Sequence, residues 1–211
     1  MYSVGVIIFP GSNCDAETVD FLKTYTGLRV NKIWHKDTNI KMHDMYIFPG
    51  GFSYGDYMRA GKLATFSPAV AEIERHIRLY EKKALGICNG FQILCELDLL
   101  PGTLRQNENL QFICKPVTIY NEEEDYKIPI AHGMGNYYHP HPELVNVAYR
   151  YSDNPNGSTN SIAGVYNHKG NVLGIMPHPE RAFKHYHVSQ DGYKILENFA
   201  TKWLKKKRKK L

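Results

Sequence analysis

The sequence predicts an α/β fold with three layers: a mostly parallel central sheet with helices on both faces, and a smaller antiparallel portion in the C-terminal half. Two observations predict it. Strand-like and helix-like segments alternate over the first hundred or so residues, and such alternation is typical of parallel sheets. From Leu110 onward the segments are shorter and richer in Pro, Asn and Gly, which favours antiparallel strands.

The first strand is expected at Tyr2–Phe9, a continuous apolar run closed by Pro10 and Gly11, as in strands buried on both faces. A helix with apolar residues three apart follows at Ala16–Tyr25. By the same criteria, further strands are expected at 29–34, 45–48 and 84–87, and helices at 67–80 and 91–97. In the C-terminal half, strands are expected at 111–120, 128–131, 162–167 and 172–176, before a last helix at 193–204.

Length and composition predict one globular domain. The chain has 211 residues, 43% of them hydrophobic and 22% charged, enough for one sizeable core and too few for two full domains. We expect this domain to span residues 1–204. The N-terminal apolar run has no preceding basic residue and no small-residue cleavage site, and nothing reaches the length of a membrane-spanning helix. We therefore expect neither a signal peptide nor a membrane span.

The positive charge is concentrated at the C-terminal end. Lys and Arg number 26 against 21 Asp and Glu, and Lys205–Lys210 holds six of these cations, which leaves 20 against 21 elsewhere. A nearly neutral body argues against a basic nucleic-acid-binding domain. We expect residues 205–211 to form a disordered, solvated tail; weak contact with RNA or an acidic partner is the alternative.

The four cysteines include no CxxC pair, so the sequence predicts neither a disulfide framework nor a zinc knuckle. A reducing, cytoplasmic setting is expected. Three of the four are poor candidates for a nucleophile by context: Cys95 lies among apolar helix residues, Cys114 in a strand and Cys14 in the first loop. The fourth is Cys88.

Cys88 stands in GICNG, between a predicted strand and a predicted helix. This pattern resembles the GxSxG nucleophile elbow with cysteine in the serine position, where Gly86 and Gly90 would allow a tight turn. A helix N-terminus favours the thiolate, and the backbone N–H of Asn89 would point to a developing oxyanion. The alternative is a buried structural cysteine in a strand-to-helix turn.

A cysteine nucleophile needs a base and a group that orients the base. The segment MPHPER places His178 between two prolines after a strand, with Glu180 two residues later. In an extended backbone both side chains would point to the same side, so Glu180 could orient the imidazole. The alternative is an incidental histidine in a polar loop.

Other histidines are weaker candidates. The pairs 139/141 and 185/187 have metal-ligand spacing but no evident third ligand, so no metal site is predicted. His132, in IPIAHGMG, could be a site-loop residue or a structural histidine.

The glycine-rich segment PGGFSYGDYMRAG follows the strand at 45–48. Gly50 and Gly51 could turn a backbone N–H into the site as the second oxyanion donor that acyl transfer requires. A phosphate-binding loop is the competing interpretation, but the segment lacks a GKS or GKT ending.

Eight motifs in order, spanning nearly the whole chain, resemble the triad class (class I) of glutamine amidotransferases, which has a flavodoxin-like fold. The likeness is greatest to the glutaminase subunits of phosphoribosylformylglycinamidine synthases. The motifs are FPGSNCD, GGFSYGDYMRAG, GICNGFQIL, LLPG, PIAHG, DNPNGS, IAGVYN and GNVLGIMPHPER. The resemblance implies that Cys88 is the nucleophile, His178 the base and Glu180 its orienting partner.

The same resemblance implies an oxyanion hole made by the backbone N–H groups of Gly51 and Asn89. It also implies a glutamine pocket that includes Gly50, Gly51, Gln92 and His132. The sequence departs from the family at Met134 and Asn136, where charged residues are common, and in its polybasic end. These departures concern the pocket rim and the tail.

The implied activity is hydrolysis of L-glutamine to glutamate and ammonia through a cysteine thioester. Ammonia would pass to a large synthetase subunit that converts formylglycinamide ribonucleotide to formylglycinamidine ribonucleotide in purine synthesis, with a small third subunit that helps assembly. This chain has no ATP-binding loop, so no cofactor is expected in it, and ATP and Mg²⁺ would be used by the synthetase. Loops near Cys14 and Tyr54–Arg59 are expected to dock this partner.

Three alternatives remain. The chain could be the glutaminase subunit of a different synthetase, or a cysteine hydrolase or redox protein on a similar fold. It could also be a non-enzymatic binder that acts through its basic tail, although the near-neutral body argues against specific nucleic-acid binding.

Overall fold

The computed structural model describes residues 2–25 and 27–208, with the side chains of residues beyond 200 left undescribed. Five strands make the parallel half of the main sheet: β1 (Tyr2–Ile8), β2 (Leu28–Trp34), β3 (Met45–Phe48), β4 (Lys83–Ile87) and β11 (Val172–Ile175). Four make the antiparallel half: β6 (Ile113–Tyr120), β7 (Asp125–His132), β9 (Asn146–Tyr151) and β10 (Ile162–Tyr166). The sheet order is β2-β1-β3-β4-β11-β10-β9-β6-β7.

The predicted fold class is confirmed. The parallel strands come first along the chain apart from β11, and the antiparallel strands belong to the C-terminal half, as the change in composition indicated. Three short strands were not predicted: β5 (Thr103–Arg105) and β8 (Asn136–Tyr138), which pair with each other, and β9. β5 and β8 have three residues each, too few for a periodic pattern.

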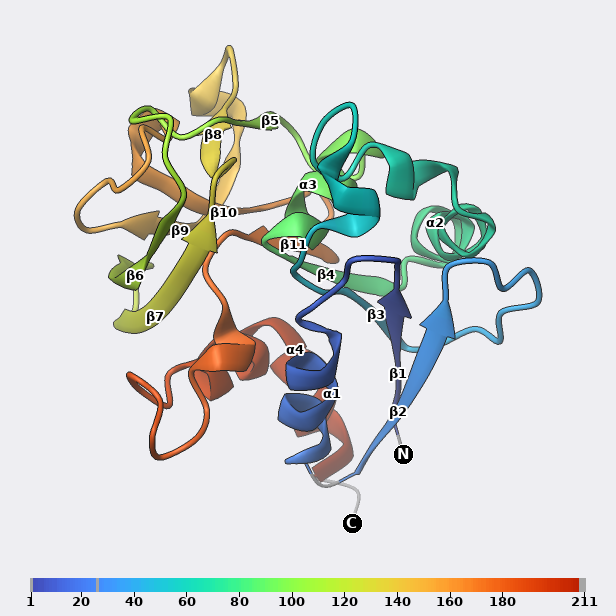
Figure 1. The fold of residues 1–211 in the computed structure, drawn as a ribbon. Helices are drawn as coiled ribbons and strands as arrows, with labels where there is room; N and C mark the ends of the chain where they lie inside the picture. The colour runs from blue at the N-terminus through green and yellow to red at the C-terminus, as the bar shows by residue number, and fades with distance from the viewer. Residues whose placement is uncertain (1, 26, 209–211) are drawn as a thin grey trace.

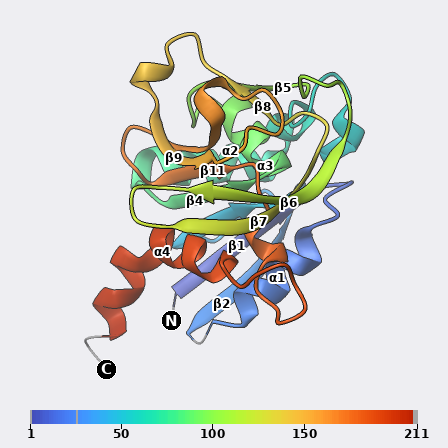
Figure 2. The same cartoon turned by 90° about the vertical axis from the view of Figure 1, so that its left-hand side faces the viewer.

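Four helices lie on the two faces of the sheet: α1 (Asp15–Lys23), α2 (Pro68–Tyr80), α3 (Asn89–Glu96) and α4 (Gly192–Arg208). Figure 2 shows α2 and α3 on one side and α1 and α4 on the other. Every residue of β3 and β11 is therefore buried. This burial on both faces explains why the central strands are continuous apolar runs.

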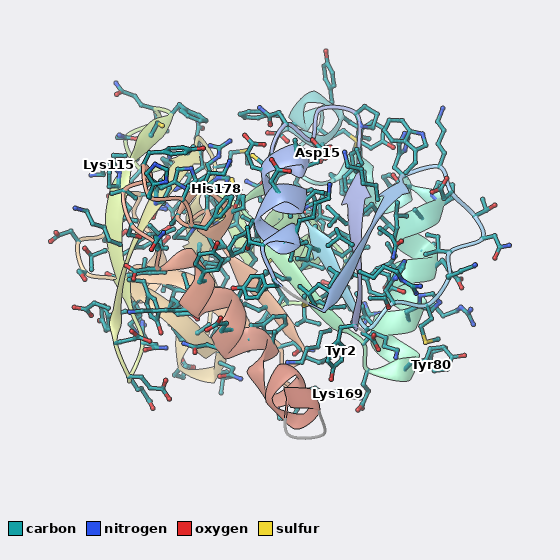
Figure 3. All side chains as sticks on the ribbon, turned by 90° about the horizontal axis from the view of Figure 1, so that it is seen from below. Tyr2, Asp15, Tyr80, Lys115, Lys169 and His178 are labelled. Atoms are coloured by element: carbon teal, nitrogen blue, oxygen red, sulfur yellow. The ribbon has the colours of Figure 1, made fainter. Side chains whose placement is uncertain are left out.

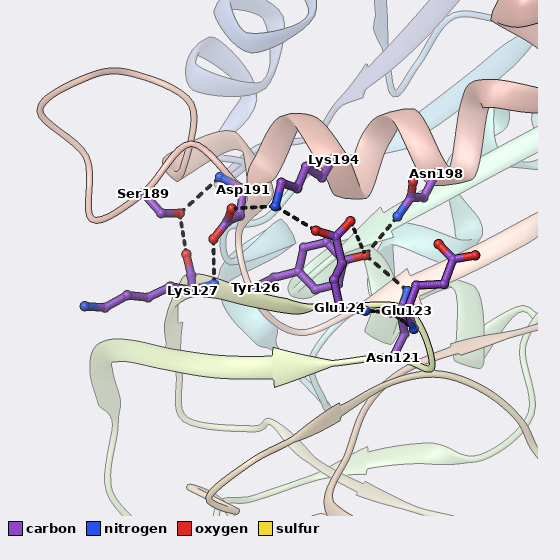
Figure 4. A network of polar contacts seen from close by, with 9 residues as sticks. All are labelled: Asn121, Glu123, Glu124, Tyr126, Lys127, Ser189, Asp191, Lys194 and Asn198. Atoms are coloured by element: carbon purple, nitrogen blue, oxygen red, sulfur yellow. Dashed lines mark hydrogen bonds and ion pairs between the residues drawn. The ribbon is translucent and has the colours of Figure 1, made fainter.

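Helix α4 is fastened to the antiparallel half by polar contacts (Figure 4). Lys194 contacts the Glu124 carboxylate at 2.7 Å, and the Asn198 amide donates to the Tyr126 hydroxyl at 2.9 Å. Just before the helix, Asp191 accepts the backbone N–H of Lys127 at 2.9 Å. These contacts hold the first half of α4 against β7 and the turn before it.

The last helix was expected to end at Leu204, but α4 continues to Arg208, since Lys and Arg are good helix formers. Residues 205–208 of the expected tail therefore belong to α4. Residues 209–211 and the side chains of 201–208 lie outside the described part, so the disorder of the last three residues stays a prediction. Among the described residues, no helix is both long enough and apolar enough to cross a membrane.

The parallel strands place their carboxyl ends at one edge of the sheet (Figure 1). In such sheets this edge is where ligands bind. Cys14 follows β1, Gly50 follows β3, Cys88 follows β4 and His178 follows β11. The topology thus brings these segments, distant in sequence, to one place.

Candidate active site

Cys88 occupies a strained turn between β4 and α3, with φ 52° and ψ −105°. An L-residue rarely adopts this conformation, which costs on the order of 1–3 kcal/mol. The Cys88 N–H donates to Ile175 O at 2.8 Å, and Sγ approaches Ala131 O at 3.7 Å. The thiol is therefore held between the elbow and the end of β7, with the residue 5% exposed.

The two glycines of the elbow are required by close packing. A Cβ on Gly90 would lie 1.9 Å from Phe48 O, and one on Gly86 would lie 2.6 Å from the Gly90 carbonyl carbon. Side chains cannot fit at these distances, so the turn from β4 into α3 can press against the end of β3 only with glycine at both positions.

His178 lies directly after β11, and its Nδ1 contacts Glu180 Oε1 at 2.6 Å, with both side chains buried. The expected pair is brought together, but the backbone between the two residues is not extended as expected. Pro179–Arg181 form a 3-10 turn, and this turn, rather than an extended segment, brings Glu180 back to the imidazole. The His178 N–H donates to Pro129 O at 2.9 Å, which joins the base to β7.

The contact with Glu180 leaves Nε2 of His178 for proton transfer. Among the described residues this buried nitrogen has no hydrogen-bond partner. Burial alone would lower the pKa of His178, but the Glu180 carboxylate and the neighbouring Cys88 thiol outweigh burial and raise this pKa well above its ordinary value. The imidazole therefore favours its protonated form beside the sulfur, which suits a thiolate–imidazolium pair.

The glycine-rich segment is a loop of unusual backbone. Positive φ angles occur at six of its residues: Gly51, Tyr54, Gly55, Asp56, Met58 and Gly61. Gly51 has φ 135°, and a Cβ there would lie 2.7 Å from Asn13 N. Only glycine fits this position, so the loop can bring the Gly51 backbone close to the segment after β1.

Side-chain bonds fix the loop to both neighbours. Asn89 Oδ1 accepts the Ser53 N–H at 3.1 Å, and Asn89 Nδ2 donates to Asp56 Oδ1 at 3.2 Å. On the far side, the Tyr54 hydroxyl contacts His35 Nδ1 at 2.5 Å and Ser67 Oγ at 2.9 Å. The loop that carries Gly51 and the elbow that carries Asn89 are therefore connected.

The other expected pocket residues are engaged within the protein. Gln92 donates to Met134 O at 2.7 Å and accepts from Asn89 at 2.9 Å. His132 is buried with Nδ1 3.0 Å from Asn107 Oδ1, and burial, with His178 nearby, lowers its pKa to about 4. A neutral His132 held by an asparagine fits the structural interpretation of this residue.

Gly50 lies against the base. A Cβ on it would be 2.8 Å from His178 Cε1 and 3.2 Å from Cys14 Sγ. The rim residue Asn136 lies in β8. The structure thus places the expected residues around one strand edge, with the roles of Gly50, Gly51, Asn89, Gln92 and His132 toward substrate still predictions.

Two residues that the sequence did not indicate also lie here. Cys14 is 3% exposed, and its Sγ accepts a hydrogen bond from Arg181 Nη2 at 3.1 Å. In Figure 3, His178 is labelled between the antiparallel strands and α1, whose first residue is Asp15. The only available signal was topological: β1 lies next to β3 in the sheet, so residues just after these two strands meet at the same edge.

The expectation that the loops near Cys14 and Tyr54–Arg59 dock a partner stays a prediction. Cys14 itself is buried, but Pro10, Gly11 and Asn13 in its loop are exposed, and Tyr57 and Met58 of the glycine-rich loop are 73% and 78% exposed.

One group of buried donors has the spacing of a metal site. Ligand atoms of Cys14, His178 and Glu180 lie within 4.8 Å of one another. The Arg181 guanidinium, 3.1 Å from the sulfur, places a positive charge where a cation would bind and disfavours one. The histidine pairs at 139/141 and 185/187 belong to no such group among the described residues.

Comparisons with known proteins agree with this geometry. The model of the CobB/CobQ-like glutamine amidotransferase domain matches residues 2–149 and 141–205. The structure of PurLQS from Thermotoga maritima includes a chain that is 39% identical, with 95% of this chain and 99% of that chain covered and a TM-score of 0.88.

More distant structures share the fold. A putative GMP synthase protein from Thermoplasma acidophilum is 14% identical, with 94% and 92% of the two chains covered and a TM-score of 0.63. A glutamine amidotransferase from Thermotoga maritima is 15% identical, with 98% and 85% covered and a TM-score of 0.58.

Proposed function

We propose, from the premise that this chain belongs to the family of CobB/CobQ-like glutamine amidotransferase domains, that it is the glutaminase subunit of a phosphoribosylformylglycinamidine synthase. The likeness to a PurLQS chain over 95% of this chain supports this assignment over the subunit of another synthetase. The observation that carries the chemistry is the buried His178–Glu180 contact of 2.6 Å beside a cysteine on a strained elbow.

In the proposed reaction the Cys88 thiolate attacks the side-chain amide carbon of L-glutamine. The C–S bond forms as the carbonyl electron pair moves to oxygen, where the N–H groups of Gly51 and Asn89 stabilise it. His178 donates its Nε2 proton to the departing nitrogen, so ammonia leaves and a glutamyl thioester remains.

Hydrolysis of the thioester completes the cycle. His178, now neutral, accepts a proton from water, and the resulting hydroxide attacks the thioester carbon. The C–S bond breaks, glutamate leaves, and the proton returns the Cys88–His178 pair to its starting state. Glu180 holds the imidazole in one tautomer throughout.

The ammonia is used in a partner. We propose that a large synthetase subunit, assembled with a small third subunit, consumes it to convert formylglycinamide ribonucleotide to formylglycinamidine ribonucleotide. ATP and Mg²⁺ belong to that subunit, and this chain uses no cofactor of its own. The exposed side chains of Tyr57 and Met58, in the same glycine-rich loop as Gly51, support docking on this face.

A cytoplasmic location fits the chemistry. All four cysteines are free, and a catalytic thiol stays reduced in a compartment that keeps thiols reduced.

The test is glutamate release from L-glutamine by this chain alone, and then with a formylglycinamidine synthase large subunit, its small subunit, ATP and formylglycinamide ribonucleotide. We expect release to appear or rise sharply with the partner. Activity that the partner leaves unchanged would point to another synthetase. Absence of release from folded protein with a free Cys88 thiol, in both settings, would contradict the proposal.

A further inference from the structure

The segment after β1 is bonded to the glycine-rich loop along its backbone. Phe52 N–H donates to Gly11 O at 2.9 Å, and Tyr54 N–H donates to Pro10 O at 2.7 Å. The contact is so close that a Cβ on Gly11 would lie 2.2 Å from Phe52 O. The backbone of residues 10–14 therefore fixes the position of the first residues of the glycine-rich loop, which carries Gly51.

Among the backbone bonds of residues 10–14, the one made by Cys14 bears directly on the proposed oxyanion donor, the Gly51 N–H. Its N–H donates to Gly50 O at 3.3 Å. The carbonyl of Gly50 and the N–H of Gly51 belong to one trans peptide, so they point in opposite directions. Holding the carbonyl toward Cys14 therefore turns the Gly51 N–H away from it, and among the described residues this N–H has no hydrogen-bond partner.

The side chain of Cys14 reaches the base. The Sγ atom and His178 Cε1 lie 3.2 Å and 2.8 Å from the point where a Gly50 Cβ would stand. Sγ is also within 4.8 Å of a His178 ring nitrogen and a Glu180 oxygen. The sulfur thus lies beside the imidazole in the space that glycine at position 50 leaves open.

Arg181 fixes that sulfur. Its Nη2 donates to Cys14 Sγ at 3.1 Å, and Arg181 directly follows Glu180 in the 3-10 turn after the base. Removing Arg181 leaves the buried sulfur without its donor, and removing Cys14 leaves the half-buried guanidinium without this acceptor. Cys14 is therefore held at two points. Its backbone N–H bonds to Gly50 O, and its sulfur accepts from Arg181, in the turn that carries Glu180.

We propose that Cys14 is a positioning residue of the glutaminase reaction, which couples the oxyanion donor at Gly51, through its backbone, to the base His178, through its sulfur. This inference rests on the proposed function. Cys14 does not bond to substrate: the nucleophile is Cys88, and Cys14 lies in the space next to the base.

The test compares Cys14→Ala, Cys14→Ser and Arg181→Gln with the wild type, each in the assembled complex. We expect the alanine and glutamine variants to lose kcat by about 10-fold to 100-fold, because a small misplacement of the base is costly, with KM for glutamine changed far less. Serine keeps an acceptor for Arg181, so Cys14→Ser should recover part of the loss. The double variant Cys14→Ala, Arg181→Gln should be no slower than the slower single variant, because both act through one contact.

A second readout needs no partner: the rate of Cys88 alkylation by iodoacetamide against pH, in the isolated chain. The Cys14 thiol contributes to the raised pKa of His178, so its removal weakens the imidazolium. The pKa of His178 should then be lower in Cys14→Ala, and the pH profile of Cys88 alkylation should differ from that of the wild type. Cys95→Ala is the matched control, because Cys95 is also buried but lies in α3 away from this cluster; it should lower stability and leave the pH profile unchanged.

Two outcomes would overturn the inference. One is a stable Cys14→Ala variant with the kcat and alkylation profile of the wild type. The other is a loss of activity that follows only the unfolded fraction, as for Cys95→Ala. Either leaves the proposed function intact, which fails instead if the wild-type complex releases no glutamate.

Discussion

The side-chain amide of Asn89 donates a hydrogen bond to the Asp56 carboxyl group across 3.2 Å. Asn89 directly follows the nucleophile and Asp56 lies in the glycine-rich loop, so this bond joins the two segments proposed to supply the oxyanion donors. Burial raises the pKa of Asp56 to about 6, although the bond from Asn89 acts in the opposite direction. The carboxyl group that accepts this bond therefore changes charge near pH 6.

The first prediction concerns Asp56→Asn. A raised pKa means that the folded protein binds this proton more tightly than the unfolded chain, so ionisation of Asp56 opposes folding. The penalty is absent below the unfolded pKa of 3.8 and complete above the folded pKa of about 6. At pH 7.5 the variant should be more stable by about 1–2 kcal/mol, allowing for partial solvent exposure. Urea unfolding at pH 4 and 7.5 measures this, and an equal gain at both pH values would show that charge is not the cause.

The second prediction concerns Glu180→Gln. Glu180 raises the pKa of His178, so the variant should hold the imidazolium less well, and kcat should fall by about 10²-fold to 10⁴-fold. Glu124→Gln, at the surface contact with Lys194, is the matched control and should keep full activity. Steady-state kinetics of glutamate release by the complexes with each variant measure this. Equal kcat values for Glu180→Gln and Glu124→Gln would show that Glu180 has no part in the mechanism.

The same pair predicts a pH dependence of stability. Because the folded pKa of His178 lies well above 6.5, its contribution to stability is complete below about pH 6.5 and is lost as pH rises through the folded pKa. The stability difference between wild type and Glu180→Gln should therefore shrink between pH 6.5 and alkaline pH. Thermal unfolding across this range provides the measurement, and a difference that grows with pH would contradict the assignment.

The third prediction concerns Gly90→Ala. The new methyl group would meet Phe48 O at 1.9 Å, so β3 and α3 must separate, at a cost of about 3 kcal/mol. Gly133→Ala is a fair control, because its Cβ would meet only Phe112 Cδ2 at 3.8 Å and should cost less than about 0.5 kcal/mol. Equal stability of the two variants would mean that the elbow tolerates a side chain.

The fourth prediction separates nucleophile from scaffold. In the assembled complex, Cys88→Ala should abolish glutamine-dependent synthesis and leave ammonia-dependent synthesis largely intact, because ammonia enters after the thiol has acted. Loss of both activities would assign Cys88 a structural role.

Much of the fold follows from local pattern. The bounds of β3 were predicted to the residue, and those of β1 and β4 within one residue, because strands buried on both faces are apolar without interruption. β9 escaped prediction because NVAYRY mixes exposed and buried positions, including Arg150, without strict alternation. Its partner β6 is separated from it along the chain by β7 and β8, so that pairing could not be inferred locally.

The triad residues could be named from sequence because a reactive side chain lies next to turn-forming residues in both motifs: Cys88 between glycines in GICNG, and His178 between prolines in MPHPER. Cys14 could not, because what makes it relevant is a neighbour 167 residues away, Arg181. For His132 the sequence left two interpretations open, and its bond to Asn107 depends on a third segment that carries no recognisable pattern. Contacts across the strand edge are properties of the topology, and a one-dimensional pattern does not contain them.

The joining of the antiparallel strands to the site has a consequence for how the protein matures. Pro129 accepts the N–H of His178, and Ala131 accepts the thiol of Cys88, so β7 completes a centre whose nucleophile and base come from either side of it in the chain. Synthesis from the N-terminus yields Cys88 well before His178, and loop closure over such separations is slow. A partly made chain therefore holds the nucleophile without its base, and the centre is complete only once β7 and β11 have joined the sheet.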